Sequence, residues 1–466
     1  MRYRIEKDLL GQRQVPAEAY YGIETLRGKE NFEITKRGIC RQMIKALAIV
    51  KKAAAKANVD ALNIDEKVGK AIMLACDEIL NGRLHGQFVT DLIQGGAGTS
   101  MNMNANEVIA NRANELLGGK KGVYDFVHPN DHVNFGQSTN DVIQTAGKIA
   151  IVKQLKKLQV ELKKLYNAYL NKATEFKDVI KMGRTHLQEA LPLRLGQEFS
   201  AYASALNRDM KRIDVAIEAL LEVNMGATAI GTSLNANEKY RKKVIYYLNK
   251  FSGEQIKPAK DLIDATRNFD TFGQASSTLK LLALNLSKTA SDLRLMASSG
   301  SNGFSEITLP HVQPGSSIMP GKYNPVVPEM VNQVCFYVIG LDVTITKAIE
   351  AGQLELNVFG PIILMSLFEQ ITTLRRATRT FHNLAISGLI ANTTKYKTDN
   401  SIYLITALSP HLGHEEACNV VNEAISSEKT IKQVLLDHHI LSEEIINMVL
   451  DESNMTNPGT VSYTHL

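Results

Sequence analysis

The stretch "IVKQLKKLQVELKKLYNAY" (151–169) indicates the fold class, because its apolar residues recur in alternating steps of four and three. They stand at Ile151, Leu155, Leu158, Leu162, Leu165 and Tyr169. This spacing places them on one face of an α-helix and does not fit strand alternation. The pattern predicts a helix over roughly 141–176, about 50 Å long. A helix of that length needs packing partners along its whole length, which favours a helical bundle.

Two further segments extend this bundle. A second helical stripe runs from Leu195 to Leu220, and the segment 326–349 is apolar nearly all round after its first turn. A helix apolar on every side is expected to be surrounded, which hints at a bundle shared between subunits. Strand signals are weak. We therefore expect an all-α protein with three domains: an N-terminal domain of mostly short helices (1–139), a central long-helix bundle (140–394) and a small C-terminal helical domain (395–466).

Length and composition limit the functional classes. The chain has 466 residues, longer than the ~250–300 residues at which single cores stop growing. Its net charge of +5 is small, and the basic runs "KKAAAK" (51–56) and "KKLQVELKKL" (156–165) are interpreted as solvated helix faces. We expect no nucleic-acid partner, because no aromatic or glycine-rich recognition segment accompanies these runs.

Several features indicate a soluble, cytoplasmic protein. The four cysteines form no CxxC pair, which fits a reducing compartment. The first residues, "MRYRIEKDLLG", lack the apolar region of a signal peptide. No run is expected to reach the ~18 apolar residues of a membrane span, since "VCFYVIGL" (334–341) ends at Asp342. We expect no membrane partner.

Three segments rich in hydroxyl and amide side chains interrupt the helical patterns: "GGAGTSMNMN" (95–104), "GQSTND" (136–141) and "GRTHLQ" (183–188). Taken singly, the first two also fit a turn or a helix N-cap, and a lone histidine in the third is more often structural. None fits a phosphate-binding or dinucleotide-binding motif. The His411/His414 pair lacks the HExxH spacing, and we expect no metal site.

A fourth segment, "PGSSIMPGKYNP" (314–325), carries two hydroxyls, one cation and one amide on a loop that three prolines keep out of any helix. Together the four segments supply ten candidate side chains: Thr99, Ser138, Thr139, Asn140, Thr185, His186, Ser316, Ser317, Lys322 and Asn324. Such a set of donors suits a small polyanion, in particular a dicarboxylate whose charge rises during the reaction.

At this point the chain resembles a known family. The G-S-S-x-M-P-x-K-x-N-P signature of the aspartase/fumarase superfamily is met by 315–325, and the resemblance extends over essentially the whole chain. "RIEKDLLG", "AYYGIETLR", "GGAGTSMNMNANEVIANRA", "QSTND" and "MGATAIGT" resemble the aspartase branch. Fumarases are similar, but usually carry TGSGTQ in place of GGAGTS and QSSND in place of QSTND.

The resemblance implies reversible deamination of L-aspartate to fumarate and ammonia, by Cβ proton abstraction through an aci-carboxylate (enediolate) intermediate and without a cofactor. It implies that Ser316 is the general base, supported by the backbone N–H groups of Ile318 and Met319. The β-carboxylate contacts would be Thr99, Ser138, Thr139 and Ser317. Lys322, Asn324 and Thr185 would contact the α-carboxylate, and Asn140 and His186 the amino group. The resemblance also implies a homotetramer in which three subunits build each site around a shared bundle.

Two alternatives stay open at this point. One is a class II fumarase-type hydratase acting on malate, which shares the acid-forming half of the mechanism. The other is a non-catalytic helical scaffold of the same fold, which the complete set of donors argues against. The chain also departs from the family pattern at Gly300-Ser301-Asn302, Tyr323, Gln144 and Ser233. These departures leave rate and exact specificity open.

Overall fold

The computed structural model describes residues 2–299, 302–393 and 401–458. Within these residues the chain is predominantly helical, with short strands that form two-stranded sheets, so the all-α prediction is confirmed. Contacts divide the chain into two compact units. Unit 1 comprises Met1–Val160, Asp209–Leu284 and Val334–Arg375, and unit 2 comprises Glu161–Arg208, Asn285–Gln333 and Arg376–Leu466. The three-domain division along the chain stays a prediction.

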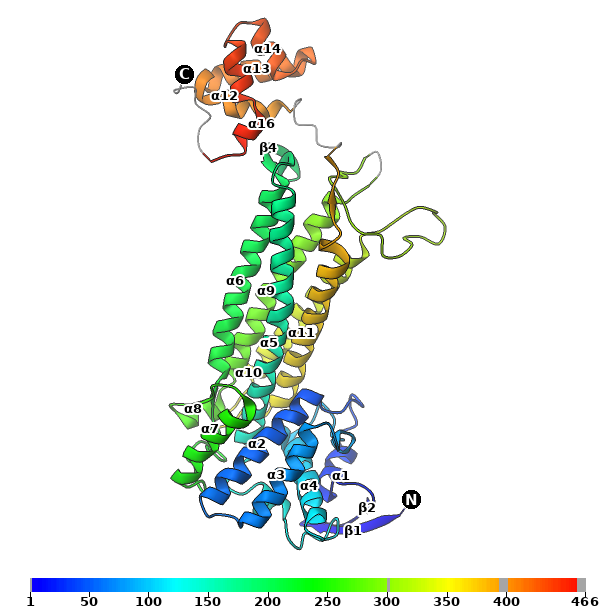
Figure 1. Cartoon of the computed structure of the whole chain (residues 1–466), viewed down its shortest axis with the longest axis vertical. Coiled ribbons are helices and arrows are strands. Elements are labelled where there is room, and N and C mark those ends of the chain that lie inside the picture. Colours follow the sequence, from blue (N-terminus) through cyan, green and yellow to red (C-terminus); the bar gives the residue numbers. More distant parts are fainter. Residues whose placement is uncertain (1, 300–301, 394–400, 459–466) are drawn as a thin grey trace. The chain divides into compact units, whose positions relative to one another are not determined.

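Five long helices, which Figure 1 draws side by side, contribute residues to both units. They are α5 (Thr139–Glu175), α6 (Leu195–Leu220), α9 (Asp270–Met296), α10 (Val326–Glu350) and α11 (Gly360–Phe381). The helix predicted over 141–176 and the stripe from Leu195 to Leu220 correspond to α5 and α6. The predicted face of α5 is buried at Leu155, Leu158 and Leu162. The helical periodicity of the sequence therefore identified the main elements correctly.

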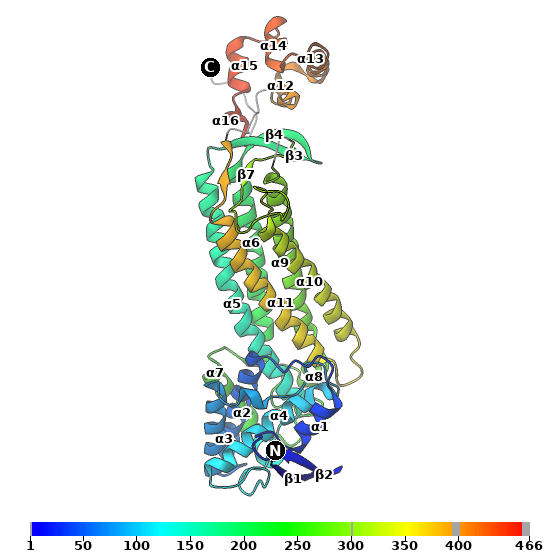
Figure 2. The same ribbon diagram turned by 90° about the vertical axis from the view of Figure 1, so that its right-hand side faces the viewer.

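Outside the five long helices, unit 1 contains α2 (Arg41–Asp60), which lies beside α3 (Glu66–Leu80) and α7 (Glu238–Ser252) (Figure 2). Its other elements are β1 (Tyr3–Asp8), β2 (Gly11–Pro16), α1 (Ile23–Asn31), η1 (His85–Gln87), η2 (Gly96–Gly98), α4 (Thr99–Leu116), η3 (Pro129–Val133), β5 (Glu222–Val223), β6 (Lys257–Pro258) and α8 (Leu262–Arg267). Because partners cover two sides of α2, Leu47 and Val50 are completely buried.

Unit 2 carries the short strands that position two of the candidate segments. These are the antiparallel pair β3 (Ile180–Thr185) and β4 (Gln188–Arg194), and the pair β7 (Ile307–Thr308) and β8 (Ile390–Ala391). The remaining elements are η4 (His382–Ile386), η6 (Ile402–Leu404), α12 (Ile405–Leu412), α13 (His414–Ser427), α14 (Ile431–Asp437), α15 (Glu443–Val449) and α16 (Glu452–Met455). Leu408, Val434 and Ile446 lie at the centre of the small core that α12–α15 enclose.

Helix α10 is long and apolar enough to cross a membrane by length and composition, with a mean hydropathy of 1.3 over its most apolar window. The expectation that no segment reaches this composition is therefore wrong for α10. Asp342 nevertheless lies buried within the helix, where its carboxylate accepts hydrogen bonds from Ser276 Oγ at 2.7 Å and Lys280 Nζ at 2.6 Å. Because these partners lie on α9, this part of α10 packs as a protein helix.

Candidate active site

The signature loop, residues 314–325, surrounds the hydroxyl of Ser316 with backbone donors. Ser316 Oγ accepts hydrogen bonds from the N–H of Ile318 at 3.2 Å and from the N–H of Met319 at 3.1 Å. Two N–H groups aimed at one oxygen stabilise its negatively charged form more strongly than its neutral form. The loop therefore provides the arrangement that a serine needs in order to act as a base.

The base of this loop is closed by hydrogen bonds within the loop itself. The N–H of Gly315 donates to the carbonyl oxygen of Lys322 at 2.8 Å, and Asn324 Nδ2 donates to the carbonyl oxygen of Gly315 at 2.6 Å. A Cβ on Gly315 would clash with the carbonyl group of Lys322, so this position requires glycine. The contacts hold Ser316, Lys322 and Asn324 on one turn of chain.

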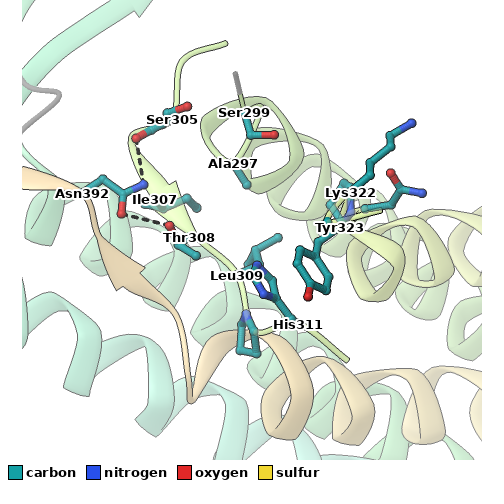
Figure 3. Close-up of a pocket in the computed structure, with 14 residues that line it drawn as sticks. Ala297, Ser299, Ser305, Ile307, Thr308, Leu309, His311, Lys322, Tyr323 and Asn392 are labelled. Carbon is teal, nitrogen blue, oxygen red and sulfur yellow. Dashed lines mark hydrogen bonds between the residues drawn. The ribbon is translucent and has the colours of Figure 1, made fainter. Parts of the chain in front are cut away.

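A pocket of about 380 Å³ lies beside the signature loop and is lined in part by His311, Lys322, Tyr323 and Asn392. Figure 3 shows the rings of His311 and Tyr323 facing each other, with Lys322 extending in another direction. The two ring centroids are 3.7 Å apart and the ring planes differ by 5°. The departure at Tyr323 thus has a specific partner, because the Tyr323 ring packs against the ring of His311.

The segment 183–188 forms the tip of a β-hairpin, where an irregular loop was predicted. Thr185 ends β3 and pairs with Gln188 at the start of β4. His186 and Leu187 make the turn with φ values of 54° and 62°. Two successive non-glycine residues in the left-handed region are uncommon, and such strain often accompanies a functional role. The hairpin displays Thr185 and His186 as exposed side chains.

Two other predicted loops are largely helix N-termini. Thr99 is the first residue of α4, and its Oγ1 donates to the carbonyl oxygen of Gly96 at 2.7 Å. Thr139 is the first residue of α5. A Cβ on Gly98 would lie 3.2 Å from Ile143, so the starts of α4 and α5 are close together. Helix N-termini offer free N–H groups and a positive partial charge, which suit a carboxylate ligand.

Ser138 and Asn140 are fixed by contacts on either side of Thr139. Ser138 Oγ accepts from the N–H of Asn140 at 3.2 Å, and Asp141 Oδ1 accepts from the N–H of Ser138 at 3.0 Å. Asp141 Oδ2 accepts from the N–H of Thr228 at 3.0 Å, and Asn140 Nδ2 donates to the carbonyl oxygen of Ala229 at 2.6 Å. Hydrogen bonds therefore connect the "QSTND" segment to the "MGATAIGT" segment.

A buried lysine that the sequence analysis missed supports the same helix start. Lys51 of α2 is completely buried, and its Nζ donates to Asn134 Oδ1 at 2.8 Å and Gln137 Oε1 at 3.0 Å. Asn102 Nδ2 bonds both Asn134 Oδ1 at 3.2 Å and Thr139 Oγ1 at 3.3 Å. The interpretation of "KKAAAK" as a solvated face is therefore wrong for Lys51, because its side chain is buried against Asn134 and Gln137.

Burial shifts both charged groups in this network. It lowers the pKa of the Lys51 amine to about 7, against the opposing effect of the nearby Asp141 charge. It raises the pKa of Asp141 to about 6, although the N–H groups of Ser138 and Thr228 and the charge of Lys51 act in the opposite direction. Burial thus moves the pKa values of both groups toward neutral pH.

Two of the remaining departures from the family pattern, Gln144 and Ser233, have a structural explanation. Gln144 is buried, and its Nε2 donates to the carbonyl oxygen of Thr266 at 2.7 Å. Ser233 adopts a φ of 60°, a left-handed conformation that glycine reaches more easily than serine. Gly300 and Ser301 lie outside the described residues.

The ten candidate side chains are distributed over the two units. Thr99, Ser138, Thr139 and Asn140 belong to unit 1. Thr185, His186 and the signature-loop residues Ser316, Ser317, Lys322 and Asn324 belong to unit 2. Their contacts with a substrate stay predictions.

Comparison with known proteins identifies the family. Residues 11–340 match the sequence model of a family described as "Lyase", and residues 404–457 match one described as "Fumarase C C-terminus". The chain is 51% identical over 459 residues to the aspartate ammonia-lyase of Bacillus subtilis (strain 168), a match that covers 98% of this chain and 97% of that protein.

Solved structures share the fold. The fumarate lyase:delta crystallin from Brucella melitensis bound to cobalt matches with a TM-score of 0.95 at 44% identity, over 98% of this chain and 100% of that one. The recombinant class II fumarase from Schistosoma mansoni also gives a TM-score of 0.95, at 34% identity and the same coverage. These similarities confirm the resemblance seen in the sequence. The chain therefore belongs to the aspartate ammonia-lyases, which are carbon–nitrogen lyases of the aspartase/fumarase superfamily.

Proposed function

We propose that the chain catalyses the reversible deamination of L-aspartate to fumarate and ammonia, with Ser316 as the general base. The observation that carries this proposal is the pair of backbone N–H groups, from Ile318 and Met319, that donate to Ser316 Oγ at 3.2 and 3.1 Å. A serine alkoxide is an adequate base only where such donors stabilise its charge.

The reaction proceeds in two steps. The Ser316 alkoxide takes a proton from Cβ of aspartate, and the electron pair of the C–H bond moves into the β-carboxylate to give the aci-carboxylate dianion. The pair then forms the Cα=Cβ double bond while the C–N bond breaks, so that the ammonium group leaves as ammonia. The proton on Ser316 returns to solvent before the next turnover.

Stabilising the dianion is the difficult part of this reaction. Thr99, Ser138, Thr139 and Ser317 are the proposed hydroxyl donors, and the first and third stand at the N-termini of α4 and α5. The single O–H of Thr99 donates to the carbonyl oxygen of Gly96 in this structure, so Thr99 must exchange that partner for the dianion. One well-aimed donor contributes about 3 kcal/mol. Four donors give on the order of 12 kcal/mol as an upper guide, since such contributions are not additive. That sum lies within the ~8–23 kcal/mol that enzymes typically supply.

The rest of the substrate is held by the other candidate residues. Lys322, Asn324 and Thr185 contact the α-carboxylate, while Asn140 and His186 contact the amino group. Asn324 donates one hydrogen bond to Gly315, and Asn140 donates one to Ala229. Because each side-chain amide carries two N–H donors and a carbonyl oxygen, both residues retain capacity for the substrate.

A homotetramer with sites built by three subunits completes the proposal. Its support is apolar surface: Leu284 of α9 is 47% exposed, and on α10 Phe336 is 62% and Val343 59% exposed. A second copy of the chain would cover such side chains.

Mixing inactive variants tests the shared site. Ser138→Ala and Ser316→Ala chains, unfolded and refolded together, should regain activity if different subunits supply these residues to one site. Each variant refolded alone should stay inactive. No gain on mixing, with tetramers formed, would contradict the shared site.

A cytoplasmic location is also proposed. It is supported by the burial of Cys76 and Cys335, as expected for cysteines that serve as small core residues in a reducing compartment.

The reaction itself is tested by the absorbance of fumarate, with purified protein given L-aspartate and, in a separate cuvette, L-malate. Fumarate from L-aspartate and not from L-malate supports the proposal. Fumarate from L-malate alone would assign the chain to the hydratase reaction instead. Repeating the assay after treatment with a metal chelator tests whether the reaction proceeds without a cofactor.

A further inference from the structure

A buried ion cluster lies beneath the hairpin that displays Thr185 and His186. Lys181 and Arg184 both stand on β3, and both pair with the carboxylate of Glu306. The distance from Lys181 Nζ to Glu306 Oε2 is 2.6 Å. The side chains of Lys181 and Glu306 are only 4% and 6% exposed, so this contact is shielded from water.

A β-bulge makes the double contact possible. Residues three apart on a regular strand point to opposite faces of the sheet, so Lys181 and Arg184 should not reach one carboxylate. The register of β3 against β4 shifts between Met182 and Arg184, which re-aims the second cation. Gly183 permits this shift, because a Cβ there would lie 2.9 Å from the carbonyl oxygen of Leu191.

Glu306 stands at the start of the segment that leads to the signature loop. Its N–H donates to the carbonyl oxygen of Met296 at 2.8 Å, and its own carbonyl oxygen accepts from the N–H of Asn392 at 2.9 Å. β7 begins at the next residue, and the chain then runs on to Ser316. The backbone of Glu306 is thus fixed to α9 and to the end of β8, while its side chain holds β3.

The Arg184 side chain has a second anchor on the same segment. Its guanidinium carbon lies 4.3 Å from the centre of the Phe304 ring, a cation–π contact two residues before Glu306. Because Arg184 directly precedes Thr185, these two contacts of its side chain hold the strand at the base of the hairpin tip.

We propose that Glu306 is a positioning residue: by pairing with Lys181 and Arg184 it holds the hairpin tip, with Thr185 and His186, in register with the segment that carries Ser316. The assignment of a substrate contact to Thr185 and His186 rests on the proposed function. The coupling between hairpin and segment rests on the ion cluster itself.

Glu198 provides a matched control. It lies on α6, is a partly buried carboxylate, and both of its oxygens are 3.2 Å from Lys181 Nζ. Glu198→Gln and Glu306→Gln therefore each remove one negative charge from the same lysine. They differ in that Glu306 belongs to the segment leading to the signature loop.

The test is steady-state kinetics with L-aspartate. Glu306→Gln should lower kcat/KM by about a hundredfold, as expected for a displaced binding group, and should raise KM. Glu198→Gln should have kcat/KM and KM values close to those of the unmodified chain. In a double-mutant cycle, Glu306→Gln should cost little further activity in the His186→Ala background, because both changes act on the same hairpin. Equal losses in both backgrounds would overturn the proposal.

A second readout does not depend on activity. Hydrogen exchange of the amides at 185–188 should accelerate in Glu306→Gln and stay unchanged in Glu198→Gln. Unchanged exchange in both variants would also overturn the proposal.

If Glu306→Gln fails to fold, the same tests are made with Arg184→Gln, since the Arg184 side chain is 23% exposed. An unmodified chain that releases no fumarate from L-aspartate would contradict the proposed function, whereas an active chain whose Glu306→Gln variant behaves normally would contradict this inference alone.

Discussion

The side-chain amine of Lys51 donates a hydrogen bond of 2.8 Å to Asn134 Oδ1, although Lys51 is completely buried. Asn134 Oδ1 also accepts from Asn102, whose amide reaches Thr139 Oγ1 at the start of α5. The buried amine of Lys51 on α2 is thereby connected to Thr139, a candidate substrate contact. Because burial lowers the pKa of this amine, the free energy of unfolding should rise with pH.

Comparing the unmodified chain with Lys51→Met should isolate the pH dependence that this amine adds to the free energy of unfolding. The amine has a pKa of about 7 in the folded chain and an ordinary value of 10.5. Between these values the unfolded chain binds more protons, so the free energy of unfolding rises with pH. The unmodified chain should therefore gain about 2 kcal/mol relative to Lys51→Met between about pH 7 and about pH 9. Chemical denaturation at matched protein concentrations measures this, and a parallel pH dependence in both proteins would refute it.

The carboxylate of Asp141 should make stability change with pH in the opposite direction, at lower pH, and Asp141→Asn should lack this dependence. Burial raises the pKa of Asp141 to about 6 from 3.8, so the folded chain binds more protons within this window. The carboxylate contribution to the free energy of unfolding therefore decreases as pH rises from about 4 to about 6, by roughly 2–3 kcal/mol. Denaturation at several pH values, compared with Asp141→Asn, checks this decrease. A contribution that grows over this range would show that the carboxylate is stabilised on folding.

Gly315→Ala should abolish the geometry of the signature loop. The added Cβ would clash with the carbonyl group of Lys322, and the hydrogen bond between the two residues would open. We expect kcat to fall by about a hundredfold with little change in overall stability, because the loop is on the surface. Gly321→Asn is the matched control: Gly321 has a φ of +80° with open space around it, and asparagine tolerates that conformation. Equal kcat values for Gly315→Ala and Gly321→Asn would contradict the claim that catalysis depends on the contact between Gly315 and Lys322.

Tyr323→Val should loosen the signature loop. The stack of Tyr323 on His311 is parallel, with centroids 3.7 Å apart, and such a pair contributes about 0.5–1.5 kcal/mol. Limited proteolysis within 314–325 should accelerate by roughly 2–10-fold, the factor that corresponds to this free energy. His311→Ala should have the same effect, and the double variant should show no further acceleration. Additive acceleration would mean that the two rings act independently.

The sequence predicted the long helices because their apolar spacing is regular over many turns, as in α5 from Leu155 to Leu165. The β3–β4 hairpin was not predictable in the same way. The bulge at Gly183 breaks the alternation of β3, and the left-handed turn at His186 uses neither glycine nor asparagine. Local patterns therefore lacked both signals on which a hairpin prediction depends.

The candidate site was predictable where a motif carries the chemistry and not where tertiary packing does. Ser316 and its neighbours follow from the signature, and the structure adds that Ile318 and Met319 donate to the serine hydroxyl. The buried position of Lys51 depends on Asn134 and Gln137, which are distant in sequence, whereas its neighbour Lys52 remains partly exposed. Nothing in the local sequence distinguishes the two lysines.

The most direct measurement of the central claim is the rate of fumarate release from L-aspartate by Ser316→Ala, compared with the unmodified chain. Removal of the general base should lower kcat by about 10³-fold or more, with the fold and oligomeric state unchanged by circular dichroism and light scattering. A Ser316→Ala variant that retains a rate within about tenfold of the unmodified chain would contradict the assignment of Ser316 as the base.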